Sequence, residues 1–168
     1  MCNFTEGNHI DYKYFDAYNV TPRYEFGYGL SYTSFNYTSA ILNVLDANAL
    51  STPYASGPLS VGGRADLWDD VVEVSVAVTN TGAIDGHEVA QLYVQFPDAA
   101  DEPVRQLRGF ERVWVPAGEY EVVVFPLRRR DLSIWDVAAQ EWKIEPGDYV
   151  FSVGASSRDL RAQQTLTI

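Results

Sequence analysis

The sequence contains a single cysteine, Cys2, among 168 residues. One thiol cannot form a disulfide within the chain, and it cannot supply the thiolate clusters that hold zinc or iron–sulfur centres. Long apolar runs are absent as well, because no stretch approaches the roughly 20 residues that a membrane-spanning helix needs. With a hydrophobic fraction of 46%, the chain is expected to be a soluble globular protein, most simply of one domain.

Positive charge is scarce. The 12 Lys and Arg residues stand against 23 Asp and Glu residues, which gives a formal net charge of −11 and a pI near 4.4. Such a field repels phosphate backbones and anionic lipid, so neither nucleic acid nor a membrane surface is expected as a partner. The one basic run, Arg128–Arg130, is interpreted as a solvated turn rather than as an anion patch.

Residue patterns typical of metal or cofactor sites are also missing. The two histidines, His9 and His87, are far apart in sequence and are interpreted as surface or turn residues. Gly27 and Gly29 lack the spacing and the lysine of a phosphate-binding loop. We therefore expect no metal and no cofactor.

The clearest pattern present is that of β-strands. Four valines at positions 72, 74, 76 and 78 alternate with mostly polar residues, which puts them on one face of a strand. Turn signals at Asn80–Gly82 and Asp85–Gly86 lead into a second strand over 87–96, which we expect to lie beside the first. Further strands are predicted over 35–45, 106–115, 120–127, 149–154 and 161–168.

About seven strands at this spacing predict an all-β fold, an immunoglobulin-like or fibronectin type III β-sandwich. No stretch has helical periodicity over three turns. Residues 46–69, rich in Ala, Ser, Pro, Gly and Asp, are predicted to form a long surface connection.

The N-terminal part differs in character. The stretch "PRYEFGYGLSYTSF", residues 22–35, holds five aromatic residues and two glycines without the period of a strand or a helix. Three Asn-X-Ser/Thr triplets begin at Asn3, Asn19 and Asn36, and their clustering favours a secreted glycoprotein, although Pro22 should hinder use of the second. Residues 1–4 do not resemble a signal peptide. The chain is thus expected either to begin inside a larger protein or to be cytoplasmic.

Four ordered motifs identify a family. "VTNTGAIDGHEVAQLYV", "QLRGFERVWVPAGE", "LRRRDLSIWD" and "GDYVFSVGASSRDLR" resemble the fibronectin type III-like domain at the C-terminus of family 3 glycoside hydrolases, above all fungal β-glucosidases. Residues 22–35 resemble the signature that joins the preceding α/β domain to that sandwich, and "FTEGNHIDYKYFDAYNVT" resembles the end of the α/β domain. The resemblance covers essentially the whole chain.

The resemblance gives the aromatic stretch a role. Residues 1–34 are expected to be an N-terminal extension and interdomain connector, and residues 35–168 the sandwich. Bulky side chains would wedge between two domains, and Gly27 and Gly29 would allow the bends. We expect an interface, or else a pocket, with the catalytic domains or a second copy of the chain as partner; its residues would be Tyr12, Tyr14, Phe15, Tyr24, Phe26 and Tyr28.

Catalytic residues are not expected here. Retaining glycosidases need two carboxyl groups about 5.5 Å apart. In the family the nucleophilic Asp lies in the N-terminal barrel, after a Ser and before a Trp, and the acid/base Glu lies in the second domain. The most similar stretches of this chain, Trp68–Asp70 and Ser133–Asp136, contain these residue types in a different order. The other acids, Asp69, Asp70, Asp98, Asp101 and Glu102, are interpreted as solvated loop residues. No glycosidase activity is expected of this chain alone.

Two tryptophans remain open to two interpretations. Trp135 and Trp142 could form a stacking platform for sugar, but in the family context they are expected to pack into the sandwich. Asp136 is expected to pair with Arg130 or Arg161. Three hypotheses follow: a structural accessory domain of a β-glucosidase, a carbohydrate-binding module, or a truncated relative with a new small-molecule activity in a pocket lined by residues 9–28. The first implies secretion with the parent enzyme.

Overall fold

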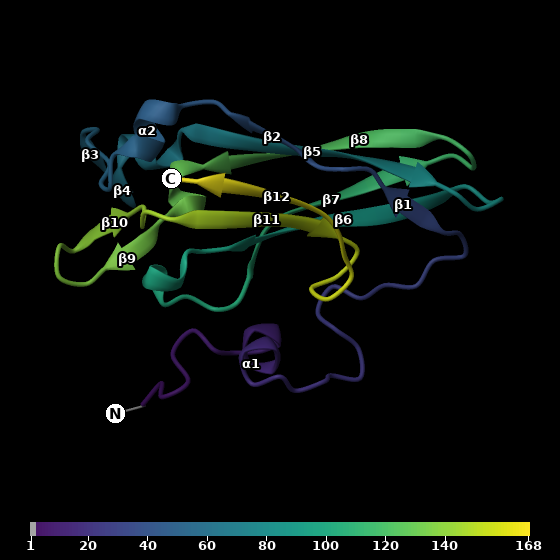
Figure 1. Ribbon diagram of the computed structural model, residues 1–168, viewed down its shortest axis with the longest axis horizontal. Coiled ribbons are helices and arrows are strands. Elements are labelled where there is room, and N and C mark those ends of the chain that lie inside the picture. Colours follow the sequence, from purple (N-terminus) through teal and green to yellow (C-terminus); the bar gives the residue numbers. More distant parts are fainter. Residues whose placement is uncertain (1–2) are drawn as a thin grey trace.

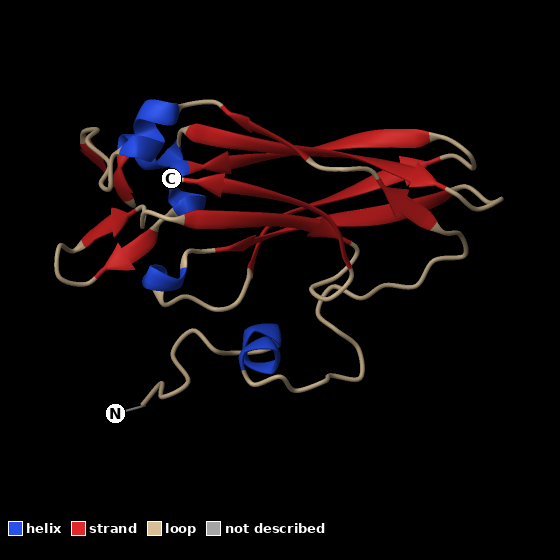
Figure 2. Ribbon diagram, viewed as in Figure 1, coloured by secondary structure: helices blue, strands red, loops and turns tan. Residues whose placement is uncertain are grey.

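The structure, a computed structural model, describes residues 3–168; Met1 and Cys2 of the predicted N-terminal extension lie outside the described residues. Two antiparallel sheets pack face to face (Figures 1 and 2). The first sheet contains β1 (Phe35–Tyr37), β2 (Ile41–Val44), β5 (Asp70–Asn80) and β8 (Tyr120–Arg128). The second has the order β12 (Leu160–Thr167), β11 (Asp148–Gly154), β6 (Gly86–Gln95) and β7 (Gln106–Val115).

The predicted strand over 35–45 is present in two pieces. β1 and β2 both pair with β5, with Tyr37 opposite Val78 and Ile41 opposite Ser75. The register shifts by one residue between them, so the two pieces follow one edge of the same sheet. Counted as one edge strand, they bring the sandwich to the predicted seven strands and confirm the all-β, fibronectin type III-like fold.

The expectation that the first two strands are neighbours is wrong. β5 and β6 belong to opposite sheets, since β5 pairs with β1, β2 and β8, whereas β6 pairs with β7 and β11. The segment between them crosses from one sheet to the other, because each strand buries one face against the facing sheet. Asn80 stabilises this crossing: its buried side-chain amide donates to the carbonyl oxygens of Ile84 and Val115.

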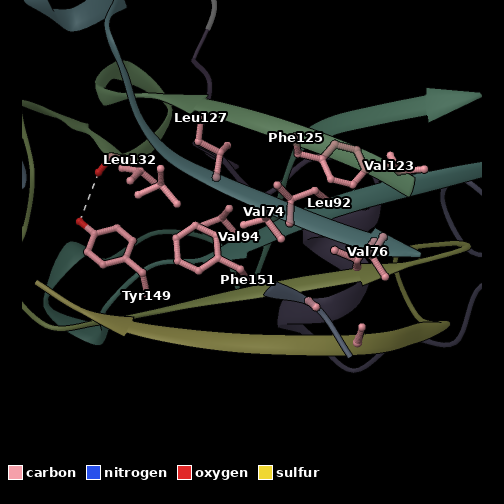
Figure 3. Packing of buried hydrophobic residues seen from close by; sticks show 14 of the residues in the cluster. Val74, Val76, Leu92, Val94, Val123, Phe125, Leu127, Leu132, Tyr149 and Phe151 are labelled. Atoms are coloured by element: carbon pink, nitrogen blue, oxygen red, sulfur yellow. Dashed lines mark hydrogen bonds between the residues drawn. The ribbon is translucent and has the colours of Figure 1, made fainter. Parts of the chain in front are cut away.

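The core lies between the two sheets. The four alternating valines of β5 are buried, as predicted, and face Leu92, Val94 and Phe151 of the second sheet (Figure 3). Each such side chain contributes roughly 1.5–3 kcal/mol on burial. The ring of Tyr149 extends this core, and its hydroxyl lies within hydrogen-bond distance of the carbonyl oxygens of Glu145 and Leu132.

Residues 46–69 are not a plain surface connection. They form a short helix, a two-stranded hairpin and a 3₁₀ helix, which bury Leu50 and Leu67. Asp46 caps the helix by accepting a hydrogen bond from the backbone N–H of Ala49. These elements, α2 (Ala47–Ser51), β3 (Leu59–Ser60), β4 (Gly63–Arg64) and η1 (Ala65–Trp68), cover one end of the sandwich (Figure 1).

The interpretation of Arg128–Arg130 as a solvated turn is wrong for its middle residue. Arg129 begins η3 (Arg129–Leu132) and is only 1% exposed. Its guanidinium donates to the carbonyl oxygens of Ala49 and Thr52, which are orphan acceptors at the end of α2. Burial lowers the pKa of this guanidinium. The arginine therefore ties the 46–69 segment to the sandwich, while Arg128 stays exposed.

The remaining short elements lie around the two sheets of the sandwich. The N-terminal segment contains α1 (Tyr12–Ala17) and runs along the outer side of the β12–β11–β6–β7 sheet (Figure 1). A 3₁₀ turn, η2 (Asp98–Ala100), follows β6, and a hairpin of β9 (Ile134–Asp136) and β10 (Glu141–Lys143) lies at the end that η1 also covers. Within residues 3–168, none of the helices has the length and apolar character to cross a bilayer.

Candidate functional sites: the connector surface and the tryptophan hairpin

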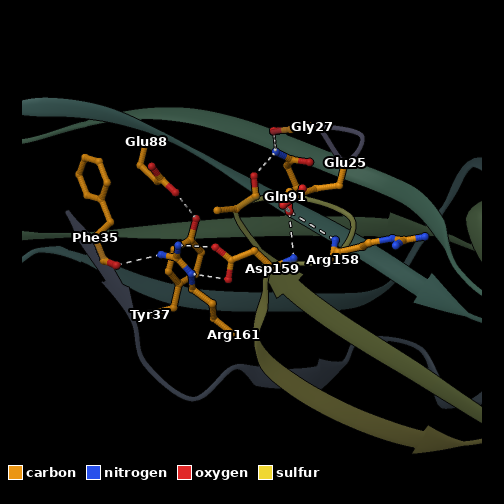
Figure 4. A network of polar contacts seen from close by, with 11 residues as sticks. Glu25, Gly27, Phe35, Tyr37, Glu88, Gln91, Arg158, Asp159 and Arg161 are labelled. Carbon is orange, nitrogen blue, oxygen red and sulfur yellow. Dashed lines mark hydrogen bonds and ion pairs between the residues drawn. The ribbon is translucent and has the colours of Figure 1, made fainter. Parts of the chain in front are cut away.

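The connector is fixed to the sandwich through one glutamine of β6. The Gln91 side-chain amide donates to the carbonyl oxygens of Gly27, at 3.0 Å, and Ala155, at 2.7 Å (Figure 4). The hydroxyl of Tyr93 donates to the other end of the same amide. A partly buried amide with its donors and its acceptor satisfied holds the backbone at Gly27 in one place.

A second anchor is electrostatic. The Asp16 carboxylate of α1, whose side chain is only 7% exposed, lies 3.0 Å from Nε of Arg158 and 3.6 Å from Nε of Arg105. Arg158 also donates to the carbonyl oxygen of Val20, and Arg105 donates to that of Ser157. Three segments that are distant in sequence are thereby joined at one carboxylate.

The predicted interface residues divide into two groups. Tyr12 packs inward: its ring stacks on that of Phe26 at 4.5 Å and meets Tyr93 edge-on, and its hydroxyl accepts a hydrogen bond from the Leu107 N–H. Burial raises the pKa of the Tyr12 phenol. Phe15 is half-buried. The other predicted residues, Tyr14, Tyr24, Phe26 and Tyr28, keep 37–63% of their surface exposed.

A hollow of about 440 Å³ separates part of the connector from β6 and β7. Its walls come from both sides and are mostly apolar: Phe26, Tyr28, Leu30, Val89, Leu107 and Phe110. Apolar side chains continue around it, with Leu30 at 89% exposure, Tyr32 at 98% and Phe110 at 68%. We call the exposed side chains of this region the connector surface; they are Tyr14, Tyr24, Tyr28, Leu30, Tyr32 and Phe110. Exposed apolar side chains gathered in this way are typical of surfaces that contact another protein.

A half-buried acid borders the same hollow. Glu88 accepts a hydrogen bond from the Tyr37 hydroxyl at 2.8 Å (Figure 4). Burial raises the pKa of this carboxyl, and the hydrogen bond from Tyr37 opposes the rise only in part. The pKa of Tyr37 is raised too, chiefly by burial and then by the charge of Glu88. The pair is therefore a desolvated network rather than a free acid.

Nearby carboxylates have partners of their own. Asp159 makes a two-pronged ion pair with Arg161, and Glu25 accepts from the Ser156 hydroxyl. The Arg161 hydrogen bond lowers the pKa of Asp159. Each of these carboxylates thus bonds to other protein groups, and Glu88 is the one acid among the described residues that line the hollow.

The acids interpreted as solvated lie as expected on loops and strand ends. Asp69, Asp70, Asp98 and Asp101 are exposed, and Glu102 is half-buried and accepts from the Gln106 amide. Among the described residues no group of three or more His, Cys, Asp or Glu side chains could hold a metal ion. His87 packs edge-on against Trp114, and His9 lies beside Tyr18.

The two tryptophans of the β9–β10 hairpin face each other across the pair. Trp135 and Trp142 are paired residues whose rings meet at 5.2 Å in a T-shape. The guanidinium of Arg130 covers Trp142 at 3.1 Å from the ring centroid, so Trp142 packs, whereas Trp135 keeps 43% of its surface exposed. The packing interpretation therefore fits Trp142, whereas Trp135 is partly open to solvent, and sugar stacking stays a prediction.

The expected ion pair of Asp136 is wrong. Its carboxylate accepts hydrogen bonds from the Tyr54 hydroxyl and from the backbone N–H groups of Ala138 and Ala139. These bonds shape the tight hairpin turn, where a short acidic side chain competes well for backbone donors. Arg130 lies on Trp142 and Arg161 pairs with Asp159 instead.

A second hollow, of about 220 Å³, lies between this hairpin and the β3–β4 hairpin. Trp135 and Trp142 form one wall, and the 2.8 Å ion pair between Arg64 and Glu141 borders it. Leu59 and Leu67 contribute apolar surface. The predicted glycosylation residues lie elsewhere: Asn3, Asn19 and Asn36 are all exposed, and their modification stays a prediction.

Sequence reasoning missed most of the anchoring residues. Nothing in the local sequence around Gln91, Arg105 and Arg158 shows their partners, and their contacts join positions up to 142 residues apart. The only signal was indirect, since Gln91 and Arg158 lie inside two of the motifs quoted above. A one-dimensional pattern cannot show which distant carbonyl or carboxylate a polar side chain will meet.

The chain resembles known proteins along its whole length. Residues 88–157 match the family model described as a fibronectin type III-like domain. A probable β-glucosidase D of Emericella nidulans is 58% identical over the whole chain, which spans 20% of that protein. The chain therefore corresponds to about a fifth of this curated relative.

Solved structures show the same match. The β-D-glucoside glucohydrolase of Trichoderma reesei superposes with a TM-score of 0.92 at 47% identity, covering 98% of this chain and 23% of that one. A glycoside hydrolase family 3 β-glucosidase of Neurospora crassa gives 0.88 at 28% identity, covering 98% and 28%. The chain thus matches a fibronectin type III-like domain over residues 88–157, and along its whole length it is similar to the C-terminal region of fungal family 3 β-glucosidases.

Proposed function

We propose that this chain acts as a structural accessory domain: it braces the remainder of a β-glucosidase-type protein and performs no hydrolysis by itself. The observation that carries the proposal is how the connector is held. Gln91 of the sandwich binds its backbone at Gly27, and Asp16 of the N-terminal segment pairs with Arg158 of the sandwich, while the connector surface faces solvent. An apolar surface of this kind on a rigid support is suited to a permanent protein contact.

The occupant of this surface is the part of the parent protein that precedes the connector. The relative of Emericella nidulans is about five times as long as the chain, and the N-terminal segment and the connector that follows it lie outside the same sheet (Figure 1). A self-dimer through the same surface is what the isolated chain would form in its place. Secretion of the parent enzyme, with glycans at the exposed sequons, belongs to the same proposal.

Binding in trans tests the docking role. The 168-residue chain is mixed with the separately produced preceding portion of its parent protein, and complex formation is followed by analytical ultracentrifugation. Leu30→Ser removes an 89% exposed apolar side chain from the connector surface and should weaken the complex. The matched control, Val122→Ser, changes an exposed residue on the outer face of the other sheet and should leave the complex unchanged. A chain that neither binds the preceding portion nor dimerises contradicts the docking role.

Hydrolysis tests the catalytic part separately. The isolated chain should release no product from an aryl β-glucoside at any pH, because the described carboxylates near the hollow are engaged with Tyr37, Ser156 and Arg161. Turnover that copurifies with the chain and is lost in Glu88→Gln would instead support the third hypothesis, an activity in the hollow beside the connector.

A further inference from the structure

We propose that the 220 Å³ hollow between the β3–β4 and β9–β10 hairpins binds a single neutral pyranose ring whose hydroxyls are equatorial. The site lies in the sandwich itself, at the end covered by both hairpins, and it is separate from the connector surface (Figure 1). The two hollows share no lining residue. The result of testing this site is therefore independent of whether the chain has the accessory role.

The aromatic wall fits one face of such a ring. Trp142 is fixed, because Arg130 covers it and the two indoles meet in a T-shape, whereas Trp135 keeps 43% of its surface exposed and lines the hollow. A pyranose with equatorial hydroxyls presents its C–H bonds on both faces, and these stack on an indole, whereas an axial hydroxyl obstructs the contact. A hollow below the roughly 300–1,000 Å³ of ordinary ligand pockets suits one ring rather than a longer ligand.

The polar wall fits the edge of the ring. Arg64 donates to Oε1 of Glu141 at 2.8 Å, and Oε2 of Glu141 accepts no hydrogen bond from the described residues. Both side chains are about one-third exposed, so hydroxyl groups can reach them. A guanidinium and a carboxylate side by side provide donors and acceptors for adjacent hydroxyls, and charge-assisted bonds of this kind are the stronger ones.

The walls are held in place before any ligand arrives. Arg64 also donates to the carbonyl oxygen of Gly57, and the Asp66 carboxylate accepts from the N–H groups of Ser56 and Gly57. On the other side, Tyr54 bonds to Asp136 and pairs with Lys143, which ties the β9–β10 hairpin to the 46–69 segment. Preorganised walls lower the entropic cost of binding.

NMR titration of the 168-residue chain tests the proposal, because its four tryptophans give separate indole N–H signals. Glucose and cellobiose are the probes, and sorbitol, which carries similar hydroxyls without a ring, is the control ligand. Glucose should move the Trp135 signal saturably, with a dissociation constant of about 2 mM, the value that ordinary ligand efficiency gives for roughly twelve non-hydrogen atoms. The Trp114 signal should not move.

Variants locate the site. Trp135→Ala, in which binding is followed through the Trp142 signal, should weaken binding about tenfold, and Glu141→Gln, which keeps the side-chain shape, about fivefold. Trp114→Ala, which removes an exposed tryptophan on β7, should bind like the unaltered chain. Binding to insoluble cellulose as well as to glucose would assign the ring to a polymer, and binding to glucose or cellobiose alone would assign it to a free sugar. Absence of saturation at about 20 mM glucose, an equal response to sorbitol, or binding unaffected by Trp135→Ala would each overturn the proposal.

Discussion

Gly27 and Gln91 lie in such close contact that a Cβ atom at position 27 has no room. Gly27 has φ +80°, a conformation that side chains rarely adopt, and Oε1 of Gln91 occupies the space where its Cβ would be. The same glutamine binds the Gly27 carbonyl oxygen. The contact ties the path of the connector to one residue of the sandwich.

The first prediction follows from this contact. Gly27→Ala combines a left-handed backbone with a clash against a hydrogen-bonded amide, and should cost about 2 kcal/mol of stability. Gly29→Ala is the matched control, because its Cβ would meet nothing within 4 Å. Chemical denaturation gives the free energy of unfolding, and hydrogen exchange shows whether the connector opens first. Equal losses in both variants would refute the role assigned to Gln91.

The second prediction concerns Asp16. Asp16→Asn removes the negative charge between Arg105 and Arg158 and should lower stability by about 2 kcal/mol. The arginines are partly exposed, so the loss falls below the roughly 3–5 kcal/mol of a fully buried pair. Asp11→Asn is the control, since the Asp11 side chain makes no cap bond to α1. Hydrogen exchange of α1 in the two variants is the direct measurement; unchanged protection in Asp16→Asn contradicts the prediction.

A third prediction addresses the buried arginine. Arg129→Leu leaves the carbonyl oxygens of Ala49 and Thr52 without their donor, and should destabilise the protein by about 3 kcal/mol. The exposed neighbour supplies the control, because Arg128→Leu should change the free energy of unfolding by no more than about 0.5 kcal/mol. Urea denaturation of both variants is the measurement. Similar unfolding midpoints would contradict the structural role assigned to the buried Arg129.

The fourth prediction is a pH dependence. The pKa of Glu88 is raised in the folded protein by burial, so the folded state binds more protons than the unfolded state between the ordinary and the raised pKa. Stability from this group is therefore present in acid and lost as the pH rises through that window. Glu88→Gln has no carboxyl that titrates at this position, so its stability does not fall in this pH window. Its amide oxygen can still accept a hydrogen bond from the Tyr37 hydroxyl.

Unfolding free energies of Glu88→Gln and the original chain should thus diverge as the pH rises above about 4.5, with the variant gaining relative stability and the difference levelling once the pH exceeds the raised pKa. Glu111→Gln, at an exposed position of β7, serves for comparison. A difference that stays constant from pH 3 to pH 8, or that reverses in sign, would contradict the burial of an ionised Glu88.

Much of the fold could be predicted from local pattern. Alternating valines from 72 to 78 identified β5 and its buried face, because a strand turns successive side chains to opposite faces. Turn residues located the ends of the other strands to within one or two residues. The pairing of β5 with β8 rather than β6 was not predicted, since alternation shows that a strand has an apolar face but not which sheet it joins.

The sequence by itself determined the all-β class, the family and the aromatic character of the connector, because these depend on periodicity, turn residues and motifs read along the chain. Only the tertiary structure decided which aromatic rings face outward, that Arg129 is buried, and that Trp135 stays open beside Arg64 and Glu141. These facts depend on contacts between residues dozens of positions apart. Chain folding sets such contacts, and no local spacing encodes them.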